Sequence, residues 1–328
     1  MCRLVSLLCA WVGMVALAVA DGPRESVVQG LYEGTCKLDG SQQKLEARVV
    51  AAGHGTYKVF VRQSLEGGKT AKIELDGKTE GDSVRFSGKA GSVLWDASYA
   101  DGAVKGTCGP GAVELKRVVR QSPALGAKPP EGAVVLLDGE DSGELVKGRL
   151  AGGAEQPWKR VEGGGIEVPK GGMTTKRRFD GSLKLHVEFK LPLMPNERSQ
   201  GRANSGVFLP NSDEIQVLDS FGMTTYKGGG CGGLYAYKDP DAFDEFSLAS
   251  APPLQWQTFD VEYRVQKKDG KPAGNPRVTV FHNGIKIHEN IESRGAIIGY
   301  SPKGKFHFQD HGNPVHYRNI WVLPLADR

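Results

Sequence analysis

Two short stretches in the C-terminal half of the chain carry acids, amides and imidazoles at the spacing of a β-strand. In residues 214–217, Glu214 and Gln216 share one face of a pleated strand, and two apolar residues share the other. A carboxyl group and an amide above an apolar core could bind a sugar and transfer a proton. Asp219 has the wrong parity for this face unless a bulge shifts it. The alternative is a solvated strand face that ends in a turn aspartate.

The second stretch, residues 306–311, carries two histidines. Alternation along a strand puts His307, Gln309 and His311 on one face, opposite two phenylalanines that belong to the core. An unperturbed histidine titrates near neutral pH, so His311 is the first candidate for a general acid or base. The alternative is a purely structural role for these histidines.

Four further side chains are candidates for contact with a sugar. Asn204 opens an Asn-Ser-Gly-Val stretch, and Asp310 could orient a neighbouring group. Tyr235 follows a glycine run and Trp256 opens a strand. Aromatic faces of this kind stack on pyranose rings, but both residues could instead belong to the core.

Several chemistries have no signature in the sequence. It contains no closely spaced Cys/His set for zinc, no phosphate-binding glycine loop opening a helix and no nucleophile elbow. The net charge of +4 is small for 328 residues and predicts no nucleic-acid partner. A divalent metal on Glu214, Asp310 or His311 stays open, and no cofactor is certain.

The segments that must position these groups have the pattern of β-strands. Apolar side chains occupy alternate positions in residues 183–191 and again in 259–265. The pair Asn283-Gly284 is preferred in tight hairpins, because both central residues take positive φ. No amphipathic helix separates these segments, so residues 133–328 are predicted to form an all-β sandwich of two sheets.

Residues 21–120 also alternate in short strands, separated by turns such as Asp76-Gly77. They predict a small antiparallel β domain, either a barrel or a sandwich, with no catalytic constellation. An accessory role and a sugar-binding role are both open for it. Residues 121–132 have the proline and glycine content of a linker.

Three cysteines follow the first 20 residues. Cys36 and Cys108 each end a Gly-Thr-Cys triplet, at opposite ends of the small β domain. In an oxidising compartment they could form a disulfide that closes the domain, and the alternative is two buried thiols. Cys231 is then left over as a small buried residue.

Residues 1–20 predict an export signal. Arg3 supplies a positive charge, residues 4–19 are apolar, and the small residues at 18 and 20 fit the pattern read by signal peptidase. The apolar stretch is shorter than the roughly 20 residues of a spanning helix. We therefore expect cleavage, a secreted or periplasmic protein, and no membrane span in the mature chain.

From about residue 134 to 325 the sequence resembles the 3-keto-disaccharide hydrolase family. The resemblance is carried by Leu137-Asp138-Gly139, Asn204 to Val207, Glu214 to Ser220, Cys231 to Tyr235, Gln309 to Pro314 and Arg318 to Trp321. It implies a concanavalin-like jelly roll with the substrate on its concave face. It also implies glycosides that a separate oxidoreductase has already oxidised at C3. Residues 236–251 depart from the family pattern, which leaves substrate preference open.

The implied reaction needs an acid, a base and hydrogen-bond donors. A carbonyl at C3 acidifies the C2 proton, so a base can remove it and expel the C1 aglycone before water adds to the enone. We expect Glu214 and His311 to share the acid and base roles. The expected hydrogen-bonding, orienting and stacking residues are Asn204, Gln216, Gln309, Asp219, Asp310, Tyr235 and Trp256.

Two other functions fit the same residues. A conventional glycoside hydrolase of laminarinase-like fold needs two carboxylates that flank the bond. Here an amide, Gln216, stands between Glu214 and Asp219. A non-catalytic carbohydrate-binding β-sandwich module would need the groove but not the acid.

Overall fold

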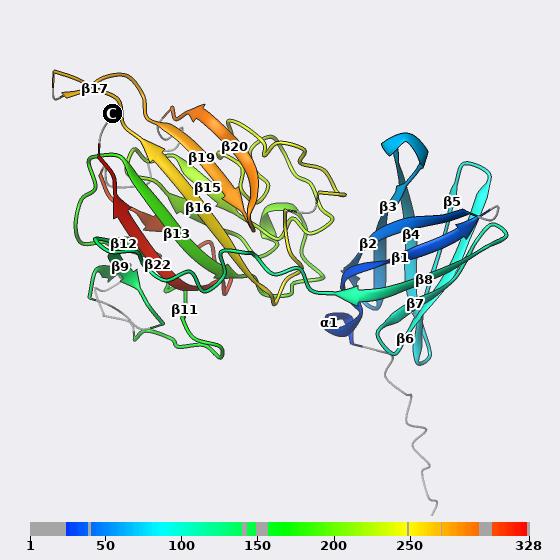
Figure 1. Cartoon of the computed structure of the whole chain (residues 1–328). Coiled ribbons are helices and arrows are strands. Elements are labelled where there is room, and N and C mark those ends of the chain that lie inside the picture. The colour runs from blue at the N-terminus through cyan, green and yellow to red at the C-terminus, as the bar shows by residue number, and fades with distance from the viewer. Residues whose placement is uncertain are drawn as a thin grey trace, which may run out of the picture.

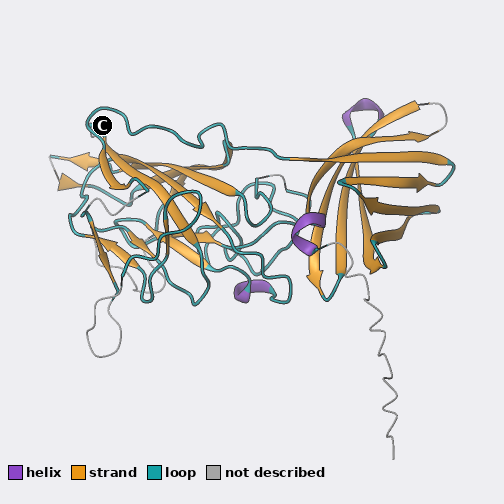
Figure 2. Cartoon of the chain, turned by 90° about the horizontal axis from the view of Figure 1, so that it is seen from below, coloured by secondary structure: helices purple, strands orange, loops and turns teal. Residues whose placement is uncertain are grey.

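The computed structural model contains a β-barrel and a β-sandwich joined by an extended segment (Figure 1). It describes residues 24–38, 41–139, 143–148, 157–247, 249–269, 271–294 and 304–326. The expected export signal lies outside these residues. Helix is confined to α1 (Glu25–Val28), η1 (Glu66–Gly68) and η2 (Ser199–Gly201) within the described ranges (Figure 2). None of these helices has the length or apolar content to cross a membrane.

Eight antiparallel strands close the barrel, because the first strand pairs with both the second and the eighth. Side chains alternate between inside and outside along each strand. In residues 93–100, for example, Trp95, Ala97 and Tyr99 are buried while their neighbours are more exposed. The strands are β1 (Gly30–Leu38), β2 (Ser41–Gly53), β3 (Thr56–Ser64), β4 (Thr70–Glu80), β5 (Ser83–Ala90), β6 (Val93–Ala100), β7 (Ala103–Cys108) and β8 (Gly111–Val118).

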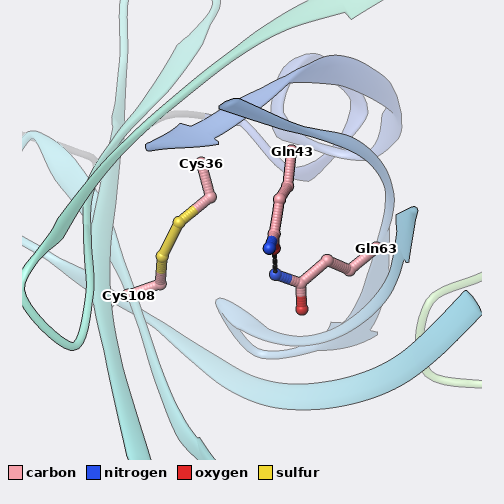
Figure 3. The surroundings of a disulfide bond; sticks show 4 residues. All are labelled: Cys36, Gln43, Gln63 and Cys108. Carbon is pink, nitrogen blue, oxygen red and sulfur yellow. Dashed lines mark hydrogen bonds between the residues drawn. A yellow bond between two sulfur atoms is a disulfide. The ribbon is translucent and has the colours of Figure 1, made fainter. Parts of the chain in front are cut away.

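A disulfide joins Cys36 on β1 to Cys108 at the end of β7 (Figure 3). Both residues are buried in the barrel core, and β8 lies between their strands. The cross-link therefore connects two strands across the inner side of β8. A hydrogen bond between the side chains of Gln43 and Gln63 lies close by.

Reduction of this disulfide should lower the free energy of unfolding of the barrel by about 4 kcal/mol, because the bond closes a long loop in the unfolded chain. Its two cysteines are 72 positions apart. Denaturant unfolding with and without reductant would measure the difference. A Cys36→Ala/Cys108→Ala variant should unfold as the reduced protein does and should not respond to reductant. An unchanged midpoint on reduction would contradict the prediction.

The sandwich consists of a five-stranded and a seven-stranded antiparallel sheet. The five-stranded sheet runs in the order β10 (Leu145–Lys147), β12 (Met173–Thr175), β21 (His307–Phe308), β14 (Ser205–Phe208), β15 (Glu214–Val217). The seven-stranded sheet runs β11 (Ile166–Glu167), β22 (His316–Pro324), β13 (Leu183–Lys190), β16 (Trp256–Arg264), β19 (Arg277–His282), β20 (Ile285–Glu292), and β9 (Val134–Leu137) pairs with β22. A separate ribbon joins β17 (Lys267–Lys268) and β18 (Lys271–Pro272).

The inner faces of the two sheets form one hydrophobic core. Val207 and Phe308 of the five-stranded sheet belong to the same buried cluster as Phe189 and Phe259 of the seven-stranded sheet. The predicted all-β class, with a jelly-roll sandwich in the C-terminal part, is confirmed. The outer face of the five-stranded sheet is left to carry polar groups.

The segment between barrel and sandwich is bound along the seven-stranded sheet. The Gly126 amide donates to Glu188 Oε1 at 2.5 Å, and the Ala127 carbonyl accepts from Asn319 Nδ2 at 3.0 Å. The hydroxyl groups of Ser122 and Thr258 are 2.7 Å apart. Composition alone predicted a linker here, but hydrogen bonds hold it in place.

Barrel and sandwich also meet directly. Phe60 of the barrel packs against Phe246 of the sandwich, with ring centroids 5.5 Å apart. Arg202 Nη1 of the sandwich donates to the Ala51 carbonyl of the barrel at 3.3 Å. Arg202 precedes the site strand β14, so this contact couples the barrel to the loop that leads into the site.

Candidate functional site

Glu214 and Gln216 lie on the outer face of the five-stranded sheet, at its edge strand β15. Ile215 and Val217 point the other way and are fully buried in the core. In the register of β14 and β15, Phe208 pairs with Glu214 and Gly206 pairs with Gln216. The alternation predicted from the sequence therefore matches the geometry of this strand.

The Glu214 carboxyl group lies over Gly206. A Cβ atom at residue 206 would lie only 2.0 Å from Glu214 Oε1, so the space that the glycine leaves is the space that the carboxyl group occupies. Glu214 is 9% exposed, and no basic residue in the described ranges pairs with it. Burial raises its pKa to about 8. At neutral pH Glu214 is therefore mainly a neutral carboxylic acid that can give up a proton.

The Gln216 amide lies beside this carboxyl group. The hydrogen-bond network favours the orientation in which its nitrogen donates to Glu214 Oε1 at 3.2 Å and to the Ser205 carbonyl at 2.8 Å. A donor on one carboxyl oxygen fixes the orientation of the group and leaves the other oxygen for a ligand.

Two more amides of the predicted set flank the glycine. The backbone amide of Gln309 donates to the Gly206 carbonyl at 2.8 Å, which places Gln309 alongside β14. Asn204 Nδ2 donates to the Gln200 carbonyl at 2.8 Å. The side-chain oxygens of Asn204 and Gln309 are buried and accept no hydrogen bond within the described part of the chain. Buried acceptors of this kind can bind the hydroxyl groups of a sugar.

Tyr235 borders the site from the loop beside β15. Its backbone amide donates to the Glu214 carbonyl at 3.0 Å, and its hydroxyl lies 2.6 Å from that of Tyr226. The two rings meet edge to face, with centroids 6.1 Å apart. Tyr226 has no signature in the sequence, because it lies in a loop without periodicity.

His307 is the imidazole that the fold places on this face. Phe208 pairs with Glu214 on one side and with His307 on the other, so the three residues lie in one row across adjacent strands. His307 Nδ1 lies 2.8 Å from the Thr174 hydroxyl. Burial lowers the pKa of His307, so its ring is neutral at physiological pH. A neutral imidazole can accept a proton.

His311 and Asp310, also candidates from the sequence, lie beyond β21 in the loop that follows it. His311 is exposed, and no hydrogen bond or ion pair joins it to Glu214 in the described structure. The Asp310 carboxylate accepts from the backbone amides of Gly171 and Gly312, both at 2.9 Å. Asp310 therefore holds two loops in place. It was expected to orient a neighbouring side chain, but its partners are backbone amides.

Asp219 and Trp256 depart from the sequence-based expectation. Asp219 Oδ2 accepts from Arg202 Nε at 2.6 Å, and both side chains are buried, so this carboxylate is not free for a sugar. Trp256 lies on the seven-stranded sheet, with Arg318 Cζ 4.1 Å and Lys190 Nζ 5.0 Å from its ring centroid. Neither Asp219 nor Trp256 is in contact with Glu214 in the described structure.

A cavity of about 600 Å³ lies beside the loop that follows β21. Its lining includes Asp310, Asn313 and Lys159. Asn313 Oδ1 also accepts from the Asn204 backbone amide at 2.6 Å. The cavity therefore lies next to Asn204, one of the amides that flank Gly206. Within the described ranges, no three Asp, Glu, His or Cys side chains are grouped to hold a metal ion.

The fold is a jelly-roll sandwich, and the site on the outer face of its five-stranded sheet contains the buried acid Glu214 with amide side chains around it. Residues 132–323 match the family described as the 3-keto-alpha-glucoside-1,2-lyase-like domain. The chain belongs to this family, and it is a carbohydrate-active enzyme. The predicted family is thereby confirmed.

Solved structures similar to part of the chain include a candidate glycosyl hydrolase. It comes from Parabacteroides distasonis, with 30% sequence identity and a TM-score of 0.49. The alignment covers 60% of this chain and 85% of that one. No curated protein matches the chain.

Proposed function

We propose that this enzyme cleaves 3-keto-glycosides by elimination and rehydration. The observation that carries the proposal is the neutral carboxylic acid of Glu214, which lies over Gly206. Expulsion of a sugar oxygen requires a proton donor, and an acid with a pKa near the working pH is the most effective one. The family match supports a 3-keto sugar as the substrate.

Each step of this reaction has a residue on the same face. His307 removes the C2 proton, and the electron pair moves through the enolate to break the C1–O bond. Glu214 donates its proton to the departing oxygen. Water then adds at C1 and gives a proton to the Glu214 carboxylate, while the His307 imidazolium, whose proton exchanges with solvent, protonates C2. This gives the free 3-keto sugar and restores both residues. The side-chain amide of Gln309 stabilises the enolate oxygen by hydrogen bonding, and Gln216 holds the Glu214 carboxyl group in position.

The assignment of the base separates two histidines. His307 is favoured over His311 because it lies in one row with Glu214 and its ring is neutral. Replacement of His307 by alanine should remove most of the activity. His311→Ala is the matched control and should keep the activity. The cavity beside Asp310 and Asn313 is the proposed place for the part of the substrate beyond the cleaved bond.

A 3-keto-glucoside and its unoxidised parent test the reaction class directly. The enzyme should release the aglycone from the keto sugar and not from the parent. In D₂O the released 3-keto sugar should carry deuterium at C2, because the proton that returns comes from solvent. Release from both glycosides would support ordinary hydrolysis, and binding without release would support a sugar-binding module.

An ordinary two-carboxylate hydrolase is less well supported. The second acid of the stretch, Asp219, is paired with Arg202 in the interior, so Glu214 has no carboxylate partner from this strand. Such hydrolases need two carboxyl groups on either side of the scissile bond.

We also propose that a separate oxidoreductase supplies the C3 ketone and that residues 1–20 direct export. The disulfide of the barrel supports an oxidising compartment, because such bonds persist in secreted and periplasmic proteins.

A further inference from the structure

Arg48 is a buried cation on β2, where the barrel meets the sandwich. Its side chain is 2% exposed. Nη1 donates to the Ser250 carbonyl at 3.4 Å, and the guanidinium carbon lies 4.8 Å from the centre of the Phe221 ring. Arg48 Nε is buried and donates to no described atom. An arginine has five N–H groups, so most of its donor capacity is unused.

No carboxylate in the described structure pairs with Arg48. Arg120, its neighbour in the same cavity, has both Glu33 and Glu46 as partners, at 2.6 and 2.5 Å. Asp244 pairs with Lys72. Burial and the nearby charges of Arg62 and Arg120 outweigh the opposite effect of Asp244 and Glu46 and lower the pKa of Arg48 to about 9, so it keeps its charge at neutral pH. A buried charge without a counter-ion is costly unless a ligand supplies one.

The cavity that Arg48 lines has a volume of about 360 Å³ and lies between the two domains. Apolar side chains such as Leu31 and Phe221 form part of its wall. Gln121 and Gln255 also line it, and no hydrogen bond occupies their side chains in the described structure. The volume accommodates a single sugar ring, and pockets of this size with few polar groups are typical ligand sites.

We propose that this interdomain cavity binds a sugar acid of one ring, a hexuronate, with its carboxylate on Arg48. The glutamine amides bind the ring hydroxyls, and the apolar wall contacts the ring carbons. A planar carboxylate suits the guanidinium group, because both can share two parallel hydrogen bonds. This site is separate from the acid of β15 and does not depend on the proposed cleavage.

Calorimetric titration of the full chain with D-glucuronate tests the site. We expect saturable binding that Arg48→Met weakens at least tenfold. The matched control is Arg85→Met on β5, which removes the same charge from the barrel outside the cavity and should change affinity less than twofold. D-Glucose, which lacks the carboxylate, should bind at least tenfold more weakly than D-glucuronate.

Three results would overturn the proposal. They are no binding of D-glucuronate, equal binding by the Arg48→Met protein, and equal affinity for inorganic sulfate, which would make the cavity a general anion site. Thermal unfolding of each variant without ligand shows that it is folded. Because the empty site buries an unpaired charge, Arg48→Met should melt at or above the temperature of the unmodified protein.

Discussion

Glu214→Gln should slow the release of aglycone from a 3-keto-glucoside by about 10²- to 10⁴-fold, the usual contribution of a positioned general acid. The amide keeps the shape of the side chain over Gly206 but has no proton to give at neutral pH. Initial rates at saturating substrate would measure the change. The matched control is Glu289→Gln on β20, an exposed acid that pairs with Lys286 and should leave the rate unchanged. A Glu214→Gln rate within threefold of the original would refute the assignment.

The same substitution has a second, pH-dependent signature. The pKa of Glu214 is about 8 in the folded protein, above its ordinary value of 4.5. The folded state therefore holds this proton more tightly than the unfolded state, and stability falls as pH rises from 4.5 to 8. Glu214→Gln should remove this fall. Activity that requires the protonated acid should decline above pH 8.

Glu188→Gln should cost about 3–5 kcal/mol of unfolding free energy, because it removes one partner from a buried charge cluster. Glu188 is fully buried on β13. Its Oε2 accepts from Arg318 Nε at 2.7 Å, and its Oε1 accepts from Asn319 Nδ2 at 2.9 Å. The same oxygen accepts from the Gly126 amide of the connecting segment. Denaturant unfolding followed by tryptophan fluorescence would measure the loss.

The pH dependence of this cluster has a definite sign. Burial alone would raise the pKa of Glu188, but hydrogen bonds from His186, Asn319 and Arg318 outweigh it and lower the pKa to about 2. Its stabilising effect is thus present above pH 4.5 and is lost as pH falls toward 2. Glu262→Gln, a half-exposed acid on β16, is the control and should change stability by less than about 0.5 kcal/mol.

His186, the partner of Glu188, loses its contribution at the opposite end of the pH range. Burial alone would lower its pKa, but hydrogen bonds to Asp260 and Glu188 raise it to about 9. Its contribution is therefore complete below pH 6.5 and is lost as pH rises through 9. Between pH 4.5 and 6.5 both contributions are complete. A Glu188→Gln protein with the same unfolding free energy as the unmodified protein in this pH range would contradict this account.

Strand periodicity predicted much of the architecture. The strict alternation in residues 183–191 and 214–217 reports burial on one face only, and this is a local property of the sequence. The same reasoning placed Glu214 and Gln216 together on a polar face. It placed His311 on the same face as His307 because it extended the alternation beyond β21, which ends at Phe308.

Strand periodicity did not predict contacts between segments that are distant in the sequence. Asp219 appeared available for a sugar because Arg202, which neutralises it, lies 17 positions earlier and at the end of a loop. Trp256 has the residue type of a sugar platform, but its strand belongs to the other sheet. Gln200 lies in the short helix η2 and Tyr226 in a loop, where neither spacing nor alternation indicates a direction. Periodicity describes one segment at a time, so it cannot predict which segments come into contact in the fold.

The bond from Arg202 to the Ala51 carbonyl has a consequence for any exchange of the barrel. Arg202 also pairs with Asp219, and two positions later the buried side-chain oxygen of Asn204 accepts no described hydrogen bond. One guanidinium group thus spans the boundary between the domains and the approach to the chemistry. Exchange of the barrel for an unrelated module would remove an acceptor that Arg202 uses in the interior. A replacement module should therefore leave Arg202 less well bonded unless it presents a carbonyl at that place.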